Sequence, residues 1–507
     1  MNKGIVATGS KEATQAGAEI LRVGGNAFDA AVAAVFTSMT SEFALTGVGG
    51  GGAMMIRKSQ AEPILYDFFV DTPPLTGKKE LEFFSVEVDF GDSTQVFHIG
   101  KGSAGVPGTL LGLVIVQEQF GALPLSIVIE PAIILAREGC PLNEKQAYIF
   151  KLLEPIFSHT TEGQSLFCKN GKILSAGELF VNTDFADFLE RVSWEGATSF
   201  YLGEVAELIA QNFGDSGLLD EKALSQYHVA VRKPVMTSFM ETQVYSNPAP
   251  SAGGTLIIFL LRLLEEGKIQ NLKDSDIVRA MAVTNTARKE VCTDPNQEYQ
   301  INQLLEKKIF NGYLKKLLSE YMDSNDNLTI PGRGETTHVS VIDRDMNCAS
   351  VTTTNGEGCG YILPGTGIML NNMLGEKDLN PLGFHKWNHP MRLPTMISPS
   401  IIMKDNRPFI LLGSGGSNRI RSAIVQVILN CIVKGEGLEE AILSPRIHLE
   451  GSQLYYEPGQ SITKNHVPNH FSLHPFETKN LFFGGVNAVT LTEGASDIRR
   501  GGTFEIV

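Results

Sequence analysis

Cysteine is scarce in this sequence, and its residues do not pair. The 507-residue chain has six cysteines, none of them in a Cys-x-x-Cys motif. Disulfide frameworks and cysteine zinc sites need closely spaced sets, so the spacing argues against both and indicates reduced, cytosolic thiols. The six are Cys140, Cys168, Cys292, Cys348, Cys359 and Cys431.

Metal-ligand motifs and excess positive charge are also missing. The ten histidines form no His-Glu-x-x-His motif or similar spacing, so we expect no metal site and no organic cofactor. Lysine and arginine number 42 against 56 acidic residues, which gives a formal charge of −14. Phosphate backbones repel such a chain, and we expect no nucleic-acid partner.

Long apolar runs are absent as well. The longest candidate, GTLIIFLLRLLEEG at 254–267, is interrupted by Arg262 and closed by two glutamates. A membrane-spanning helix needs about 20 apolar residues, so we expect no membrane partner. The opening MNKGIVATGSKEATQ lacks the apolar core of a secretory signal, and we therefore expect a cytoplasmic location.

The first half of the chain alternates helix and strand signals. Helical spacing of apolar residues over 11–23 ends at a glycine pair, and Asn26 can cap a second helix over 28–39. Four consecutive glycines at 49–52 then lead into an apolar strand. A phosphate-binding loop would need a lysine and a hydroxyl residue at a helix start, so close approach of another segment is the better interpretation.

The second half is richer in strands. Residues 338–345, 347–354 and 401–413 read as strands, with hairpin signals at MKDNRP and within NAVTLTEGASDIRRGG. A glycine turn at 414–416 leads into a long apolar helix. Strands clustered with helices between and after them predict a mixed α/β fold of the layered αββα type, without an independent linker-separated domain.

The segment GETTHVSVIDRD at 334–345 raises the question of function. Two threonines and a histidine stand at the start of a predicted strand, just after the polar stretch NDNLTIPGRG. Thr336 is either a β-branched strand residue or an exposed nucleophile next to a scissile bond.

Six blocks in chain order settle the question by resemblance. They are EILRVGGNAFDAAVAA, GVGGGGAMMI, GVPGT, NPAPSAGG, ETTHVSVIDRD followed by GTGIMLNN, and GSGGSNRI followed by SPRIH. The ordered set resembles the γ-glutamyltransferase (γ-glutamyltranspeptidase) family of N-terminal-nucleophile hydrolases over nearly the whole chain. The resemblance implies a four-layer αββα sandwich formed by two intertwined subunits cut from one precursor.

The resemblance places the cut at the Glu335–Thr336 bond. The products are a large subunit, residues 1–335, and a small subunit, residues 336–507, which together form one structural unit. A threonine hydroxyl needs a base beside it, and a free α-amine has a pKa near neutrality. Cleavage supplies that amine on the nucleophile itself, so no Ser-His-Asp triad is required.

Further catalytic positions follow from the same resemblance. Thr354 matches a second threonine that hydrogen-bonds the nucleophile. Gly415 and Gly416 match the glycine pair whose backbone N–H groups form the oxyanion hole, with Gly416 and Ser417 as the alternative pair. His338 is assigned a structural role rather than that of a base.

The pocket residues match the family less well. Asn355 and Asn372 fall near positions that line the family's pocket, and Glu376 is expected to be the acid that holds the substrate's α-amino group. Thr395 keeps one hydroxyl of the serine pair expected for the α-carboxylate, whereas Met396 replaces the other.

The residues expected to bind the substrate's α-carboxylate, and the lid over the pocket, depart further from the family. The family's arginine that pairs with the substrate's α-carboxylate should fall just after VDTPP, but the segment GKKELEFF there contains no arginine. Only Lys78 or Lys79 could replace it, and lysine is a poorer partner for a carboxylate than arginine. The segment between Asn372 and Arg392 is short, which predicts a reduced lid and favours hydrolysis over transfer.

Three functions remain open at this stage. The first is an autoprocessed amidase that acts on a γ-glutamyl amide such as glutathione through an acyl-enzyme, which water or an amine acceptor releases. The second keeps this chemistry for another acyl group, as in cephalosporin and glutaryl acylases. The third is an unprocessed, non-catalytic member of the family.

Overall fold

The protein is described from a computed structural model of the full chain. The structure describes residues 3–75, 80–89, 94–269, 272–291, 300–319, 336–380, 383–460, 462–463, 467 and 470–507.

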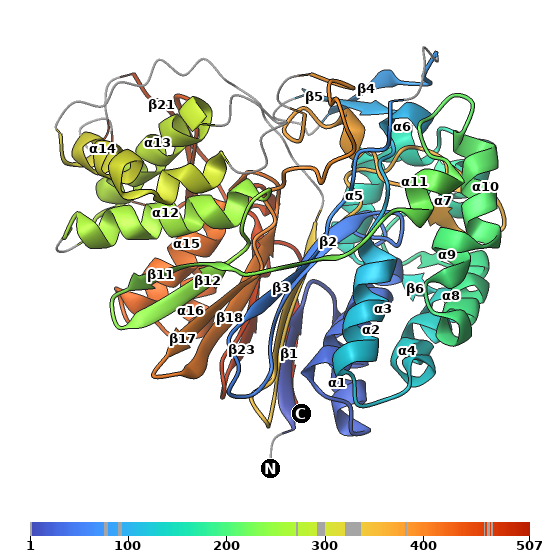
Figure 1. Cartoon of the computed structure of the whole chain (residues 1–507), viewed down its shortest axis with the longest axis horizontal. Coiled ribbons are helices and arrows are strands. Elements are labelled where there is room, and N and C mark those ends of the chain that lie inside the picture. The colour runs from blue at the N-terminus through green and yellow to red at the C-terminus, as the bar shows by residue number, and fades with distance from the viewer. Residues whose placement is uncertain are drawn as a thin grey trace.

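Two antiparallel sheets form the centre of the molecule (Figure 1). The first has the strand order β10-β3-β2-β14-β13-β1-β24 and the second the order β11-β12-β17-β18-β22-β23. The first sheet comprises β10 (Ala230–Arg232), β3 (Ile64–Phe68), β2 (Gly51–Arg57), β14 (Cys348–Thr354), β13 (Thr337–Asp343), β1 (Gly4–Thr8) and β24 (Thr503–Ile506). The second comprises β11 (Val235–Phe239), β12 (Thr242–Ser246), β17 (Ser400–Lys404), β18 (Arg407–Gly415), β22 (Gly485–Val489) and β23 (Gly494–Ser496).

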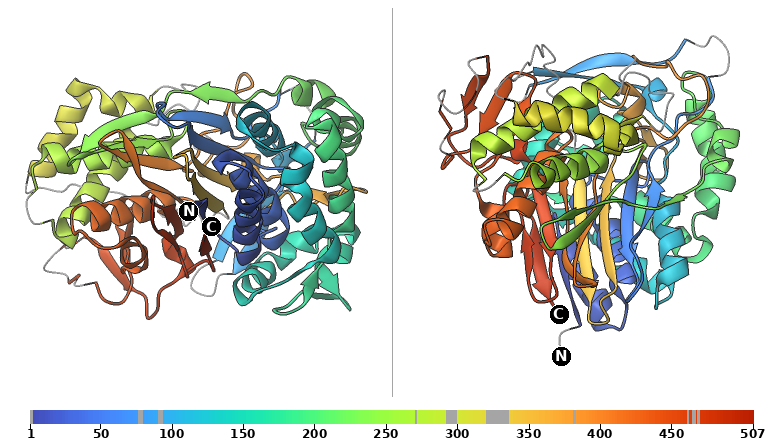
Figure 2. Two further views of the ribbon diagram at one scale, coloured as in Figure 1. Left: turned by 90° about the horizontal axis from the view of Figure 1, so that it is seen from below. Right: turned by 60° about the vertical axis from the view of Figure 1, so that its left-hand side comes forward.

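The two sheets pack face to face through β13, β14, β18 and β22. Polar contacts cross between them: the Ser350 hydroxyl donates to the Leu412 carbonyl at 3.2 Å, and the Asn487 amide donates to the His338 carbonyl at 2.7 Å. In the right-hand view of Figure 2 the yellow strands of β13 and β14 run between blue strands of the N-terminal part. The central strands of the first sheet therefore come from both halves of the chain.

Helices cover the outer face of each sheet, which confirms the predicted αββα layers (Figure 1). The first layer holds α1 (Lys11–Arg22), α2 (Ala27–Ser41), α3 (Thr109–Phe120) and α4 (Leu125–Glu138). The second holds α12 (Ala252–Glu266), α13 (Asp274–Val291) and α15 (Arg419–Ile432). In the described part of the chain, no helix combines the length and apolarity needed to cross a bilayer.

The remaining helices and strands are shorter or lie outside these layers. The helices are α5 (Glu144–Leu152), α6 (Glu154–Phe157), α7 (Thr161–Phe167), α8 (Thr183–Glu195), α9 (Thr198–Leu202), α10 (Glu204–Phe213), α11 (Glu221–Ser225), α14 (Lys307–Leu318) and α16 (Leu438–Leu443), with short 3₁₀ turns η1 (Lys101–Ser103), η2 (Ile301–Leu305), η3 (Met373–Gly375) and η4 (Leu481–Phe483). The strands are β4 (Phe84–Asp89), β5 (Thr94–Ile99), β6 (Cys140–Pro141), β7 (Cys168–Lys169), β8 (Lys172–Ile173), β9 (Leu179–Phe180), β15 (Ile362–Leu363), β16 (Ile368–Met369), β19 (Ile447–Glu450), β20 (Gln453–Tyr456) and β21 (Ser472–Pro475).

Strand β2 shows how the first sheet divides the interior into two cores. Ala53 and Met55 point into the core shared with the second sheet, whereas Met54 and Ile56 point into the core under α1 to α4. Successive side chains of a strand leave opposite faces, so a strand buried on both faces is apolar throughout. This explains the continuous apolar run that follows the four glycines.

The local signals in the sequence form the elements they predict. Ser10 caps α1, and Asn26 and Asp29 form a capping box at the start of α2. The hairpin predicted at MKDNRP joins β17 to β18, with Asp405 and Asn406 at positive φ, and the last predicted hairpin joins β22 to β23.

The four glycines permit close approach of neighbouring backbone, as predicted. A β-carbon at Gly49 would overlap the Met369 carbonyl, and one at Gly50 would overlap the Thr354 carbonyl. Any side chain at these positions would therefore push β14 and β16 away from the end of β2.

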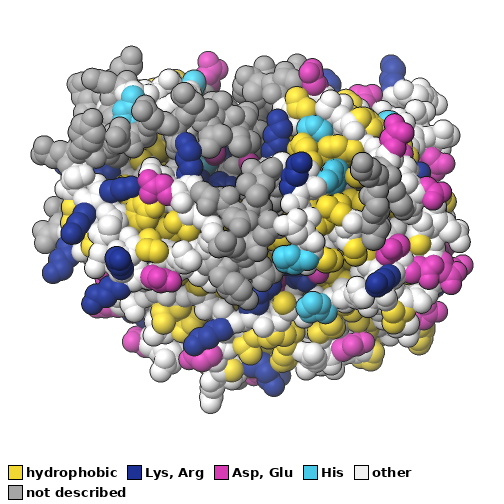
Figure 3. Space-filling view, turned by 45° about the horizontal axis from the view of Figure 1, so that its top comes forward, with side chains coloured by type: hydrophobic (Ala, Val, Ile, Leu, Met, Phe, Trp, Pro, Cys, Tyr) yellow, Lys and Arg dark blue, Asp and Glu magenta, His cyan; other side chains and the backbone are white. Residues whose placement is uncertain are grey.

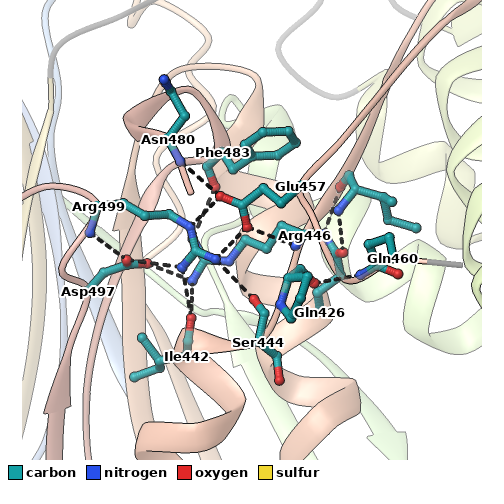
Figure 4. Close-up of polar contacts among 12 residues, drawn as sticks. Gln426, Ile442, Ser444, Arg446, Glu457, Gln460, Asn480, Phe483, Asp497 and Arg499 are labelled. Carbon is teal, nitrogen blue, oxygen red and sulfur yellow. Dashed lines mark hydrogen bonds and ion pairs between the residues drawn. The ribbon is translucent and has the colours of Figure 1, made fainter. Parts of the chain in front are cut away.

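A buried network of charged side chains lies next to β22 and β23, the last strands of the second sheet along the chain (Figure 4). Arg499 pairs with Glu457 and Asp497, and Arg446 pairs with Asp497 at 2.6 Å. Asp497 also accepts a hydrogen bond from the backbone N–H of Val486 in β22. Removing one member of such a network leaves a buried charge uncompensated, so it strongly specifies this local arrangement.

Candidate active site

Thr336 lies directly before β13, in the middle of the first sheet and against the end of β18 in the second. Its side chain is nearly buried, with 4% exposure. A β-carbon at Gly415 would overlap the Thr336 carbonyl oxygen, so only glycine fits at the end of β18. Glu335, on the other side of the predicted scissile bond, lies outside the described residues.

The residues after Thr336 point alternately to the two faces of the sheet. The Thr337 hydroxyl donates to Glu42 Oε2 at 2.7 Å, beside the first helical layer. His338 faces the second sheet, where its ring lies over Gly413. Burial raises the pKa of the Glu42 carboxyl to about 7, and it outweighs the opposing effects of the Thr337 and Ser10 hydroxyls and of the Arg500 charge.

His338 is held on both ring nitrogens. Its Nδ1 contacts the Thr352 hydroxyl at 2.8 Å and its Nε2 contacts the Ser340 hydroxyl at 2.9 Å. Burial lowers the pKa of His338 to about 3, because desolvation disfavours the imidazolium. A neutral ring with both nitrogens engaged fits the structural role predicted for it.

One cavity brings several of the predicted residues together. It encloses about 400 Å³, measured with its opening to solvent. Thr336, Thr354, Glu376 and Thr395 all line it. The other lining residues are Phe69, Met373, Asp378, Leu379, Met396, Ile397, Ser417 and Ile420.

Thr354 reaches the cavity from the end of β14. The pairing of Thr337 with Thr353 puts the start of β13 beside the end of β14, and thus Thr336 and Thr354 at the same edge of the sheet. The Thr354 hydroxyl accepts a hydrogen bond from the Gly356 N–H at 3.0 Å.

Gly415 and Gly416 form the turn between β18 and α15. Gly415 pairs with Gly485 of β22, and Gly416 has φ of +119°, a conformation that disfavours any side chain. Ser417, the alternative donor position, lines the cavity itself. The turn therefore presents backbone groups, rather than side chains, next to the Thr336 carbonyl.

Asn355 and Asn372 are not among the cavity-lining residues. Asn372 Oδ1 accepts from the Glu357 N–H at 2.9 Å, and its amide donates to the Glu357 carboxylate at 3.2 Å. The Asn355 amide donates to the Met369 carbonyl at 3.1 Å. The structure thus places both asparagines behind the lining, where they hold the segment that leads to Glu376.

The acidic side of the cavity holds two carboxyl groups, which corrects the prediction that Glu376 is the only acid. Burial and the neighbouring Asp378 raise the pKa of Glu376 to about 8, and burial also raises that of Asp378. Asp378 Oδ2 accepts from the Asn418 amide at 2.8 Å. The sequence signal was an acid two residues after Glu376, in a stretch that forms no helix.

The side expected to hold a carboxylate is largely apolar. Met396 and Phe69 are apolar residues of the lining, and Thr395 Oγ1 accepts from the Ile397 N–H at 3.2 Å. Lys78 and Lys79 lie outside the described residues. Among the described residues, no cluster of three or more metal-ligating side chains occurs.

The sandwich and the threonine at the head of its central strand define the class of protein, an N-terminal-nucleophile hydrolase. The sequence then gives the family. The family model for gamma-glutamyltranspeptidase matches residues 13–507, so the chain belongs to the γ-glutamyltranspeptidase family. The predicted family and the prediction of an enzyme are both confirmed.

Curated relatives agree with this assignment. The chain is 30% identical to the glutathione hydrolase proenzyme of Escherichia coli (strain K12), with 88% of this chain and 81% of that protein covered. It is also 30% identical to the capsule biosynthesis protein CapD proenzyme of Bacillus anthracis, with 97% and 89% covered.

Solved structures show the same fold. The cephalosporin acylase from Bacillus halodurans superposes with a TM-score of 0.83 at 22% identity, over 99% of this chain and 96% of that chain. The Helicobacter pylori gamma-glutamyltranspeptidase matches with a TM-score of 0.53 at 28% identity, over 62% of this chain and 91% of that chain.

Proposed function

We propose that the chain is a precursor that hydrolyses its own Glu335–Thr336 bond and then acts as an amidase of the γ-glutamyltransferase type. Cleavage consumes one water and leaves a carboxylate on Glu335 and an α-amine on Thr336. The observation that carries the proposal is the meeting of Thr336 and Thr354 in one cavity, with the Gly415–Gly416 turn against the Thr336 carbonyl. The proenzyme names of the curated relatives support the precursor.

The roles follow from the chemistry of the groups. The Thr336 amine accepts the hydroxyl proton as Oγ1 attacks the amide carbon, and the carbonyl oxygen becomes an oxyanion. N–H groups of Gly415 and Gly416 stabilise that oxyanion. The proton then passes to the leaving nitrogen, the C–N bond breaks, and an ester on Thr336 remains. Water or an acceptor amine attacks the ester and releases the acyl group.

Thr354 and the pocket acids complete this assignment. The Thr354 hydroxyl orients Thr336 Oγ1, while Asn355 and Asn372 position the acidic segment from behind. Glu376, with Asp378 beside it, holds the amino group of the acyl donor. Thr395 contributes a hydroxyl on the opposite side.

The large and small fragments and a small-molecule amide are the partners that this reaction needs. Figure 3 shows basic and acidic side chains interspersed on the face it presents, without a continuous basic field. Together with the charge of −14, this supports a small substrate rather than a nucleic acid.

Two variants of one residue test the proposal. The Thr336→Ala chain should stay full length on a denaturing gel and turn over no amide, because it lacks the nucleophile. The Thr336→Ser chain keeps a hydroxyl and should split at the same bond and retain turnover. Splitting of the Thr336→Ala chain at residue 336, or turnover by it, would contradict the proposal.

A specific observation also supports the second candidate function, an amidase for another acyl group. No lysine or arginine is among the described residues that line the cavity. A γ-glutamyl donor carries an α-carboxylate that needs a partner when buried. A panel of acyl anilides separates the two functions, and a cleaved chain excludes the unprocessed, non-catalytic alternative.

A further inference from the structure

The cavity beside Thr336 has an unbalanced set of ionisable side chains. Its described lining includes two carboxyl groups, Glu376 and Asp378, and no lysine, arginine or histidine. Three arginines act on Asp378, namely Arg288, Arg419 and Arg421. They belong to α13 and α15, and none of them is a lining residue. The cavity surface therefore favours a bound cation over a bound anion.

Glu376 is available to a ligand. Its Oε1 atom is buried and accepts no hydrogen bond in the described structure. A buried acceptor without a donor is costly, and an ammonium group supplies the missing donors together with the opposite charge. The geometry at Gly356 supports this location, because a β-carbon there would lie 2.5 Å from Oε1 and overlap Asn372 Oδ1. Asn372 Oδ1 already accepts from the Glu357 N–H, so Glu376 Oε1 is the acceptor of this pair that lacks a donor in the described structure.

Apart from the two acids, the described lining offers a carboxylate no positively charged partner, because its other polar side chains are the neutral hydroxyls of Thr336, Thr354, Thr395 and Ser417. The Phe69 backbone is fixed from two sides, because its N–H donates to Asp67 at 3.1 Å and its carbonyl accepts from Tyr227 at 2.7 Å. Its side chain carries no polar atom, so Phe69 is an apolar part of the cavity wall. Met396, which also lines the cavity, offers no hydrogen-bond donor in its side chain.

Resting on the function proposed above, we propose that the enzyme selects acyl donors that carry an ammonium group and no carboxylate. The substrate class is amides of ω-amino acids, of which 4-aminobutanoyl amides are the simplest test case. A γ-glutamyl donor offers the same ammonium group but must bury its α-carboxylate between two acids and an apolar wall. A glutaryl donor brings the carboxylate alone.

Four p-nitroanilides isolate the two groups, because they share a four- or five-carbon acyl chain. The γ-glutamyl anilide has the amine and the carboxylate, the 4-aminobutanoyl anilide only the amine, the glutaryl anilide only the carboxylate, and the butanoyl anilide neither. With the cleaved enzyme, kcat/KM for the 4-aminobutanoyl anilide should exceed those of the γ-glutamyl and glutaryl anilides by at least about tenfold.

Variants of the acids test the cause of the preference. Glu376→Gln and Asp378→Asn should each lower kcat/KM for the 4-aminobutanoyl anilide by a larger factor than kcat/KM for the butanoyl anilide. Glu439→Gln, which removes an exposed acid on α16, is the matched charge control and should change neither. Competitive inhibition by free 4-aminobutanoate, compared with glutarate, gives a second readout that does not depend on the chemical step.

The outcomes separate this inference from the function on which it rests. A cleaved enzyme that turns over the γ-glutamyl or glutaryl anilide as fast as the 4-aminobutanoyl anilide overturns the inference and leaves the proposed function intact. An equal loss with the butanoyl anilide in the Glu376→Gln variant also overturns it. An uncleaved chain without turnover of any of the four anilides contradicts the proposed function itself.

Discussion

The backbone carbonyl of Thr336 lies against Gly415 so closely that no other residue fits at position 415. One residue is the predicted nucleophile, and the other is the last residue of β18 in the second sheet, 79 positions later (415 minus 336). Because β13 and β18 belong to different sheets, their contact depends on the packing of the whole sandwich. The reacting hydroxyl and the turn that would bind the oxyanion are thus fixed relative to each other.

Replacing Gly415 with alanine should therefore impair catalysis. The added methyl group moves the Thr336 carbonyl or the turn, and loss of one oxyanion donor lowers kcat by about 10²–10³. Steady-state kinetics on a cleaved preparation measure the effect. Gly312→Ala is the control, since Gly312 lies within α14 with nothing near its β-carbon position, and it should leave kcat unchanged. Equal kinetics for both variants would contradict the assigned role of Gly415.

Turnover of amine-bearing donors should depend on the ionisation of Glu376. Its pKa is raised to about 8 by burial and by Asp378, so the empty site is mostly protonated at neutral pH. An ammonium group pairs with the ionised form, and kcat/KM should therefore rise between about pH 7 and 9. Deprotonation of the Thr336 α-amine affects both substrates alike, so the ratio of kcat/KM for the 4-aminobutanoyl anilide to that for the butanoyl anilide should rise over this range, and in the Glu376→Gln variant the ratio should stay constant. A ratio of the two substrates that does not change with pH would contradict the assignment.

Replacing Glu42 with glutamine should stabilise the protein at alkaline pH. The folded-state pKa is raised from 4.5 to about 7, so ionisation above pH 4.5 favours the unfolded chain and stability falls up to about pH 7. Glutamine keeps an oxygen that accepts from the Thr337 hydroxyl and cannot ionise. The Glu42→Gln variant should thus have a higher Tm than the unaltered chain, and this difference should be larger at pH 8 than at pH 5. The exposed Glu439→Gln variant should show equal differences at the two pH values.

His338 should make the fold sensitive to acid. Its pKa is lowered from 6.5 to about 3 in the folded chain, so the unfolded chain binds the extra proton between these values. Stability is therefore lost as the pH falls from about 6.5 toward 3, by roughly 1.4 kcal/mol per pKa unit. In a His338→Gln variant, Tm should fall less steeply over this range. An unchanged slope would show that other groups, such as His448, dominate the acid response.

Much of the fold could be predicted from the sequence because its signals are local. Asn26 and Asp29 specify the start of α2, and the Asp405–Asn406 pair specifies the turn between β17 and β18. The order of strands in the sheets depends on contacts between distant segments, such as β1 with β13. The αββα layers were therefore predicted, but the order of the strands was not.

The candidate site was predictable where a motif marked it and not elsewhere. Thr336, Thr354 and Gly415 belong to motifs, and the structure brings them to one edge of the sandwich. Asp378 was missed because no motif covers it and its neighbour Glu376 was the nearer match. Asn355 and Asn372 were expected in the lining, but each turns its amide to backbone or to Glu357 instead. Which side of a loop faces a cavity is set by tertiary packing, and a motif does not encode it.

The intact masses of the polypeptides in a purified, catalytically active preparation test the central claim most directly. The account predicts two species that correspond to residues 1–335 and 336–507, the smaller one with an unblocked amino-terminal threonine. A preparation that hydrolyses amides at full rate while it contains only the continuous 507-residue chain would contradict it.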